Sequence, residues 1–262
     1  MSDAAMRNRG VVLLLALAAA GCVPPVRRAL PAPFPLTGGA VPLPAHGVAL
    51  PLELHHGLRG QELDRTQIVA VGLVTGIQDG FSFGLNAYQD FRRGGVGGHA
   101  AQLKVPVARV LAGRGVVAVR GSVAFASRRD STAQNEALTV WDLAVPITVR
   151  VDSGRGDDRF MALYAGPRLL YEHYVDRLLP GESMDAAVPG LLVGVHLGLN
   201  ALPLFRDAEG LTGLHVFAEA TLARVPRNVY QGVSYGGQVS VMPAVGAAFQ
   251  FGRPFRWMKR AR

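Results

Sequence analysis

The histidines and acidic residues are the side chains whose chemistry would first suggest a metal centre or an active site. Seven histidines are present; His55 and His56 are adjacent, while His196 and His215 fall in two apolar segments. A zinc site needs at least three protein ligands in one place, and the chain shows no histidine or carboxylate spacing of that kind. We therefore expect no metal or other cofactor, and we interpret these histidines as parts of a polar interior.

A serine-based catalytic set would have to be assembled from residues far apart in the chain. Ser122, Ser240, His196 and Glu219 supply the necessary groups. Such catalysis needs a hydroxyl, a base and an acid within hydrogen-bond reach, and no G-x-S-x-G motif surrounds either serine. The sequence favours a protein that is not an enzyme, and a lipid-active barrel enzyme stays open as an alternative.

The single cysteine ends an apolar N-terminal segment. Two arginines precede the apolar run 10–20, which is too short to span a membrane as a mature helix, and Ala19-Ala20-Gly21-Cys22 closes it. This arrangement resembles the lipobox of bacterial lipoproteins, with alanine at position 19 where the family most often has leucine. The resemblance implies a signal peptide over 1–21 and lipidation of Cys22. An ordinary cleaved signal would instead leave one unpaired thiol in an exported chain.

Export decides how the formal net charge of +8 is interpreted. Basic proteins often bind nucleic acid, but an exported protein does not normally meet it, so we expect no nucleic-acid partner. Part of the excess lies in residues 252–262, which form a basic C-terminal tail. Residues 22–46 contain seven prolines, which predicts an extended tether.

Residues 47–251 repeat one pattern, in which apolar residues alternate with small or polar ones until a turn signal follows. Alternation with a period of two predicts strands. We expect ten, over 47–55, 66–77, 80–92, 97–110, 114–128, 136–151, 158–174, 188–204, 211–225 and 236–251. Hydrophobic residues make up 49% of the chain, yet outside the N-terminus no apolar run reaches the roughly 18–20 residues of a spanning helix.

The two faces of these segments differ in kind. One carries large apolar residues, and the other carries glycine, alanine, serine and isolated charges of both signs. A water-exposed face would hold more lysine and glutamate, so we expect the apolar faces to meet lipid and the polar faces to line the interior. An interior polar network is expected from Lys104, Arg120, Asp142, Arg168, Glu172, His196, His215 and Glu219. Within it, Arg168 and Glu172 are expected to form an ion pair.

The predicted connections suggest an orientation. Those after the second, fourth, sixth and eighth segments are shorter than those after the first, fifth, seventh and ninth, while 93–96 breaks the trend. Transmembrane barrels have short periplasmic turns and longer outer loops. An even strand number would then place both termini on the periplasmic side, where a lipidated Cys22 would lie.

The region 47–251 resembles the small outer-membrane β-barrel proteins of Gram-negative bacteria, through patterns such as 81–85 (FSFGL) and a last strand that ends in Phe251. The chain departs from them by its tail. The resemblance implies an all-β fold: a single closed antiparallel up-and-down transmembrane barrel of about ten strands, with eight as the alternative. It also implies an outer-membrane location, contact with outer-membrane lipid and with the lipoprotein-sorting and barrel-assembly machinery, and a monomeric state.

We expect a structural or surface-interaction role for such a barrel. Eight strands are filled by side chains, and open aqueous channels belong to barrels of 16–18 strands. A narrow channel or a small-molecule-binding barrel remains the functional alternative, and a soluble lipocalin-like lipoprotein remains the architectural one.

Overall fold

A computed structural model describes residues 43–57, 66–78, 81–90, 96–129, 135–152, 159–176, 183–200, 210–224, 228–230, 233–235 and 239–252. The expected signal peptide, Cys22, most of the expected tether and the tail residues 253–262 lie outside the described residues. Within them the fold is all β, apart from one short 3-10 turn, η1 (Leu111–Gly113). No helix among these residues is long and apolar enough to cross a membrane.

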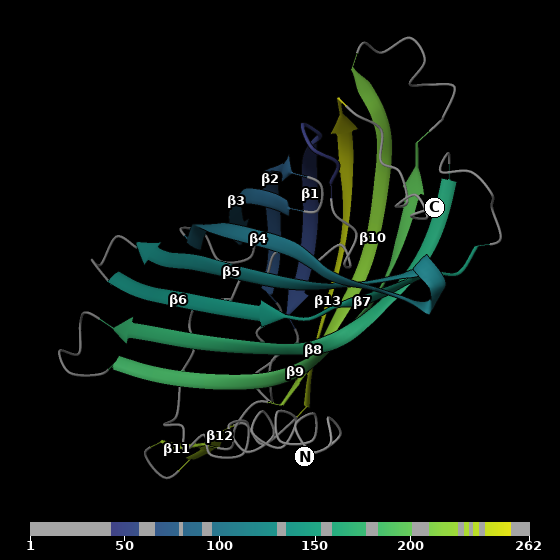
Figure 1. Cartoon of the computed structure of the whole chain (residues 1–262). Helices are drawn as coiled ribbons and strands as arrows, with labels where there is room; N and C mark the ends of the chain where they lie inside the picture. The colour runs from purple at the N-terminus through teal and green to yellow at the C-terminus, as the bar shows by residue number, and fades with distance from the viewer. Residues whose placement is uncertain are drawn as a thin grey trace, which may run out of the picture.

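The strands form one closed antiparallel barrel (Figure 1). They are β1 (Val48–Gly57), β2 (Thr66–Gln78), β3 (Phe81–Asp90), β4 (Val96–Val110), β5 (Gly115–Arg129), β6 (Asn135–Ala144), β7 (Ile147–Arg150), β8 (Arg159–Asp176), β9 (Ser183–Leu199), β10 (Leu211–Arg224), β11 (Asn228–Tyr230), β12 (Val233–Tyr235) and β13 (Val239–Phe251). Each strand of the wall is hydrogen-bonded to the next one around the barrel. β13 pairs with both β10 and β1, which closes the sheet. β11 and β12 form a separate hairpin.

β6 and β7 occupy a single place in the barrel wall, because both pair with β5 on one side and with β8 on the other. The break between them falls at Pro146, which has no amide hydrogen to donate to a neighbouring strand. The ladder resumes around it: Val145 N donates to Pro167 O at 3.0 Å, and Ala118 N donates to Pro146 O at 3.1 Å. The barrel therefore has ten strands, which confirms the fold expected from the sequence.

The two faces of each strand point as the alternation predicts. On β8 the exposed side chains include Met161, Leu163, Leu169 and Tyr171, and the buried ones include Phe160, Tyr164, Arg168 and Glu172. The exposed apolar band from Met161 to Tyr171 covers about 33 Å of strand at ~3.3 Å per residue. A strand tilt of about 40° reduces this to about 25 Å, the height of the apolar band of transmembrane barrels.

The connections differ from the expected pattern. At one end of the barrel, here called the lower rim, consecutive strands are connected through residues 79–80, 111–114, 151–158 and 200–210. At the opposite end, the upper rim, the connections are 58–65, 91–95, 130–134, 177–182 and 225–238. The predicted contrast between short lower-rim and long upper-rim connections is wrong, because the upper-rim connections 91–95 and 130–134 are shorter than the lower-rim connections 151–158 and 200–210. In addition, β8 and β9 stay paired through about half of the expected loop 175–187. Tyr174, for example, pairs with Met184. Strand extension, rather than loop length, distinguishes the upper rim at these strands.

Aromatic and polar side chains mark where the outer apolar surface ends. Phe125, Trp141 and Tyr171 are exposed on the neighbouring strands β5, β6 and β8 towards the upper rim, and the rings of Trp141 and Tyr171 lie 5.4 Å apart. Beyond Tyr171, the exposed pair His173 and Asp185 meets at 2.8 Å. Aromatic girdles of this kind flank the apolar band of transmembrane barrels, where one end of each ring is wet.

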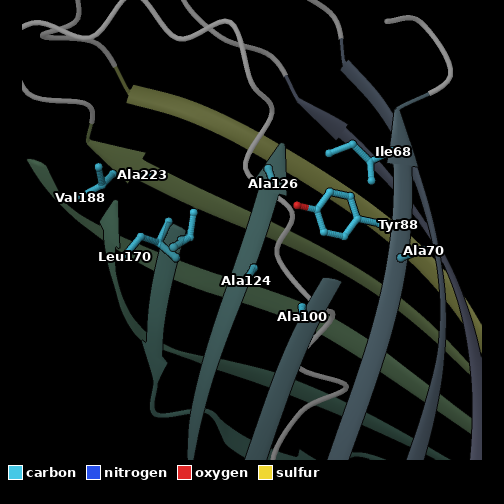
Figure 2. Packing of buried hydrophobic residues seen from close by; sticks show 10 residues of the cluster. Ile68, Ala70, Tyr88, Ala100, Ala124, Ala126, Leu170, Val188 and Ala223 are labelled. Atoms are coloured by element: carbon cyan, nitrogen blue, oxygen red, sulfur yellow. The ribbon is translucent and has the colours of Figure 1, made fainter. Parts of the chain in front are cut away.

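Apolar side chains also form a layer inside the barrel, on the upper-rim side of the buried charges. Its members are Ile68, Ala70, Tyr88, Ala100, Ala124, Ala126, Val140, Leu170, Val188 and Ala223. Figure 2 shows Tyr88 and Ile68 on one side of the interior and Leu170 and Val188 on the other. Tyr88 fixes its ring by donating from its hydroxyl to Phe125 O at 2.6 Å. This inner apolar layer lies between the upper rim and the buried charges of Arg120, Asp142, Arg168 and Glu219, while the buried Glu172 lies on the upper-rim side of Leu170.

Candidate functional site

A buried cluster of charges lies below the inner apolar layer, and Asp142 on β6 is its centre. The Arg120 guanidinium on β5 donates to Asp142 Oδ2. Arg168 on β8 donates from Nε to Oδ1 at 3.0 Å and from Nη2 to Oδ2 at 2.7 Å, which is a bidentate contact. Ser122 adds a hydroxyl donor at 3.3 Å. Paired, hydrogen-bonded geometry of this kind is what allows charges to stay buried.

Arg168 extends the cluster to β10. Its Nη1 atom lies 3.2 Å from Glu219 Oε1 and donates to Thr221 Oγ1 at 2.7 Å. Tyr164, also on β8, donates its hydroxyl to Glu219 Oε2 at 3.1 Å. One guanidinium thus binds two carboxylates, and Glu219 is held by an arginine and a tyrosine together.

The opposite wall contributes Lys104 and Glu53. Lys104 on β4 is half-buried and lies directly opposite Arg120 on the neighbouring strand β5, while Glu53 lies on β1. In a ring of ten strands, β4 and β10 stand on opposite sides, so Lys104 and Glu219 come from opposite walls of the barrel. Glu53 accepts from Asn86 Nδ2 at 3.2 Å and lies 2.9 Å from His55 Nε2. Charges from both walls therefore meet at the same level of the barrel.

The two expected interior histidines form a second site, nearer the lower rim. His196 Nε2 lies 2.8 Å from His215 Nδ1, and His215 Nε2 lies 2.7 Å from Gln250 Oε1. Because an amide oxygen only accepts, His215 carries its hydrogen on Nε2 and accepts from His196 Nε2 on its other nitrogen. The remaining His196 Nδ1 is buried with no hydrogen-bond partner among the described residues.

Aromatic rings enclose the histidine pair. The ring centroid of Phe160 lies 4.8 Å from that of His196, and the centroid of Phe217 lies 4.4 Å from it on the neighbouring strand. In the part of the chain that is described, no group of three or more histidine, cysteine or acidic residues is placed to hold a metal ion. The geometry is that of a neutral hydrogen-bonded pair within an apolar surround.

Most of the expected network residues are brought together in the interior of the barrel. Ion pairs join Arg120, Asp142, Arg168 and Glu219, Lys104 lies opposite Arg120 on the neighbouring strand, and His196 and His215 pair with each other. Glu172 is buried four residues beyond Arg168 on the extended β8, about 13 Å along the strand. The Arg168 guanidinium lies on Asp142 and Glu219, and its expected pairing with Glu172 stays a prediction.

Sequence reasoning missed Glu53 and Asn86. The residues around Glu53 alternate cleanly, since Leu50, Leu52 and Leu54 are exposed while Glu53 is buried. That signal was readable, although a proline at the inward position 51 and a second histidine at position 56 blur the pattern at both ends. Of the candidate catalytic residues, Ser122 bonds to Asp142, and His196 bonds to another histidine.

The chain matches no protein-family model and no curated protein. Among solved structures it is similar to Neisserial surface protein A, at 8% identity over 78% of this chain and 96% of that chain, with a TM-score of 0.37. It is similar to Ail, the attachment invasion locus protein of Yersinia pestis, at 11% identity over 80% of this chain and 100% of that one, with a TM-score of 0.34. The outer membrane protease OmpT from Escherichia coli is similar at 9% identity over 79% of this chain and 95% of that one, with a TM-score of 0.32. We carry no residue role over from these proteins.

Proposed function

We propose that this chain is an outer-membrane lipoprotein whose barrel is closed by its own side chains and serves a structural or surface-interaction role. The observation that carries the proposal is the double contact of Arg168 with Asp142 and Glu219, all three of which are buried inside the barrel. A barrel used for transport of polar solutes keeps its interior charges solvated, whereas these are buried and bonded to one another.

The buried pairing gives the barrel a closed interior for a physical reason. A solute that passed this level would have to separate ion pairs whose partners are desolvated, and removal of one partner from a buried pair costs about 3–5 kcal/mol. The inner apolar layer adds a second barrier above the charges, because ions and polar solutes gain no hydrogen bonds from its alanines and leucine. These two layers support a filled barrel over a narrow channel.

The membrane location and the anchor are parts of the same proposal. The exposed apolar band of about 25 Å fits a bilayer, and a closed barrel leaves no unpaired edge that would require a partner chain. We propose a monomer with both termini on the periplasmic side, lipidated at Cys22, delivered by the lipoprotein-sorting and barrel-assembly machinery and surrounded by outer-membrane lipid. Acyl chains contribute about 0.8 kcal/mol of membrane affinity per buried CH₂. Because an embedded barrel needs no further affinity for the membrane, the lipid serves to direct the protein to the outer membrane.

Planar-bilayer recordings test the closed interior. The mature chain should give no conductance steps, while the double variant Asp142→Ala with Arg168→Ala should give small ones, because it removes the centre of the charged cluster. Asp185→Ala, on the outer surface, is the control and should stay silent. Regular steps from the unaltered protein would show a channel and overturn the proposal.

Membrane fractionation tests the location separately. A Cys22→Ser variant carries no lipid; it should stay in the outer-membrane fraction and keep a heat-modifiable migration on gels, because the barrel itself is embedded. Release of this variant into the soluble periplasm would identify a lipocalin-like lipoprotein instead.

A further inference from the structure

The β4–β5 hairpin extends past its neighbour β3 at the lower rim. β3 pairs with β4 only as far as Lys104, which lies opposite Ser82. Beyond that point β4 pairs with β5 alone among the described residues, down to Val110 opposite Gly115, and η1 forms the turn between the two strands (Figure 1). The edge of β4 beyond Lys104 therefore faces no other strand of the described chain.

The tip of this hairpin carries a leucine in a backbone conformation that leucine rarely adopts. Leu111 and Ala112 have φ values of 52° and 53°, in the left-handed region where glycine and asparagine are the usual residues. Leu111 is also 61% exposed, more than any other described large apolar residue except Val239. Strained positions of this kind concentrate at functional sites. The hairpin thus holds an apolar side chain out from the barrel at a conformational cost.

Two arginines flank the tip, and the hairpin itself contains no acidic residue. Arg109 and Arg114 are both exposed, and residues 91–129 include neither aspartate nor glutamate. A β-bulge between Pro106 and Ala108 precedes Arg109, and bulges re-aim the side chains beside them. The hairpin therefore presents two guanidinium groups next to one apolar tip.

Strand pairing places the hairpin at the lower end of the outer apolar band. Arg150 N donates to Arg114 O at 2.9 Å, and Arg150 pairs with Ala162, which precedes Leu163 and follows Met161, where the exposed band of β8 begins. A backbone group without a hydrogen-bond partner is strongly unfavourable in hydrocarbon. The open edge of β4 therefore belongs in the headgroup layer, where water and phosphate oxygens accept hydrogen bonds.

We propose that the β4–β5 hairpin is a binding site for anionic phospholipids, in which Arg109 and Arg114 bind the headgroup phosphate and Leu111 reaches the start of the acyl chains. Guanidinium groups bind phosphate through paired, charge-assisted hydrogen bonds. Cations combined with an apolar side chain are typical of segments that lie in the membrane interface. The proposal rests on the membrane location proposed above, and it names the class of lipid that the lower rim selects there.

Native mass spectrometry of the full mature chain, released from detergent micelles with increasing phosphatidylglycerol or phosphatidylcholine, measures the affinity for each lipid. The unaltered protein should bind phosphatidylglycerol more tightly. Arg109→Gln with Arg114→Gln should weaken that binding by about tenfold or more, because each cation near an anionic surface contributes about fivefold. Binding of phosphatidylcholine should not change. Arg224→Gln is the matched control, since Arg224 is an exposed arginine at the upper-rim end of β10.

Leu111→Asn separates a lipid contact from a purely structural role of the turn. Asparagine adopts the left-handed conformation more readily than leucine, so this variant should unfold at a higher denaturant concentration and yet bind both phospholipids more weakly. Heat-modifiable migration on gels shows that each variant is folded.

Three results would overturn the proposal: equal binding of the two lipids by the unaltered protein, unchanged binding by the arginine or the leucine variant, or displacement of phosphatidylglycerol by inorganic phosphate. The last result would identify a site for free phosphate. A folded barrel that retains neither lipid would contradict the membrane location as well, whereas equal binding of both lipids leaves that location intact. Failure of the lipid site and failure of the proposed function can therefore be told apart.

Discussion

Arg168 and Glu219 are joined by a 3.2 Å contact although their strands, β8 and β10, are separated by β9. The side chains can pass over β9 because the residues of β9 that pair with them are glycines: Gly190 lies opposite Arg168, and Gly194 lies opposite Glu219. An added Cβ at Gly194 would meet the ring of Tyr164, which bonds to Glu219, and one at Gly190 would meet the backbone of Leu222 and the side chain of Thr221, to which Arg168 donates. The contact thus depends on small residues of the intervening strand as much as on the two charges.

Removal of the central carboxylate should destabilise the barrel strongly. Asp142→Ala leaves the buried guanidinium groups of Arg120 and Arg168 without their shared partner, at an expected loss of about 3–5 kcal/mol in the free energy of unfolding. Denaturant unfolding of the protein refolded in lipid vesicles measures this. Asp185→Ala breaks an exposed pair and should cost less than about 1 kcal/mol; equal losses for both variants would contradict the assigned role of Asp142.

The glycine at position 194 should tolerate no larger residue. An added Cβ would lie 2.3 Å from Tyr164 Cζ, and that ring cannot retreat without breaking its hydroxyl bond to Glu219. Gly194→Val is expected to lose about 1–3 kcal/mol through overpacking. Gly121→Val, which points into open space on the outer face, should change stability little in the same unfolding assay. A neutral Gly194→Val variant would show that Tyr164 moves freely.

The two histidines should differ in their effect on stability. His215→Phe removes a residue bonded on both sides and strands His196 Nε2 and Gln250 Oε1, each at about 1–3 kcal/mol for an unsatisfied buried group. His196→Phe strands only His215 Nδ1 and also removes the unpaired His196 Nδ1, so it should cost less. The ratio of the two losses, measured by unfolding in vesicles, checks the assigned direction of the hydrogen bonds. A larger loss for His196→Phe would reverse it.

A charged residue introduced on the outer surface should lower the stability of the barrel by an amount that depends on its depth in the bilayer. Leu85 is exposed near the middle of β3, and Phe81 is exposed at its lower-rim end. In a bilayer, Leu85→Arg should cost about 2–4 kcal/mol, and a cationic substitution near the interface should cost about 0–1 kcal/mol. Folding yield and stability in vesicles compare Leu85→Arg with Phe81→Arg. Equal tolerance of the two substitutions would indicate that this surface meets water.

The strand number and the two faces could be predicted because both depend on local alternation. The large outward residues of β8, for example, are Met161, Leu163, Leu169 and Tyr171, all at odd-numbered positions. Registers could not be predicted, since they depend on which residues of neighbouring strands face each other. The individual contacts of Arg168 within the expected network could not be assigned for that reason: Glu172 is near in sequence, whereas Glu219 is brought near only by the stagger of three strands.

At the upper rim, the length of the strands was harder to predict than their alternation. The sequence 175–187 contains glycine, proline and charges, which are typical of loops, yet β8 and β9 remain paired through much of it. Strand pairing continues there because β8 and β9 are already aligned by their pairing closer to the lower rim. The entropic cost of ordering each further residue is therefore small. The amino-acid composition of a turn does not reveal how far pairing with the neighbouring strand extends.

The charged contacts also bear on the order of events during membrane insertion. The contacts of Arg120, Asp142, Arg168 and Glu219 described above all arise within the contiguous sheet from β5 to β10, and Glu53 meets Asn86 within β1 to β3. The seam between β1 and β13 carries none of these contacts. The part of the sheet from β5 to β10 can therefore pair its buried charges, and Glu53 can form its hydrogen bond with Asn86, before the ends of the sheet meet. An assembly intermediate with an open seam would enter the bilayer with these ions already paired, which lowers the barrier that isolated charges would raise.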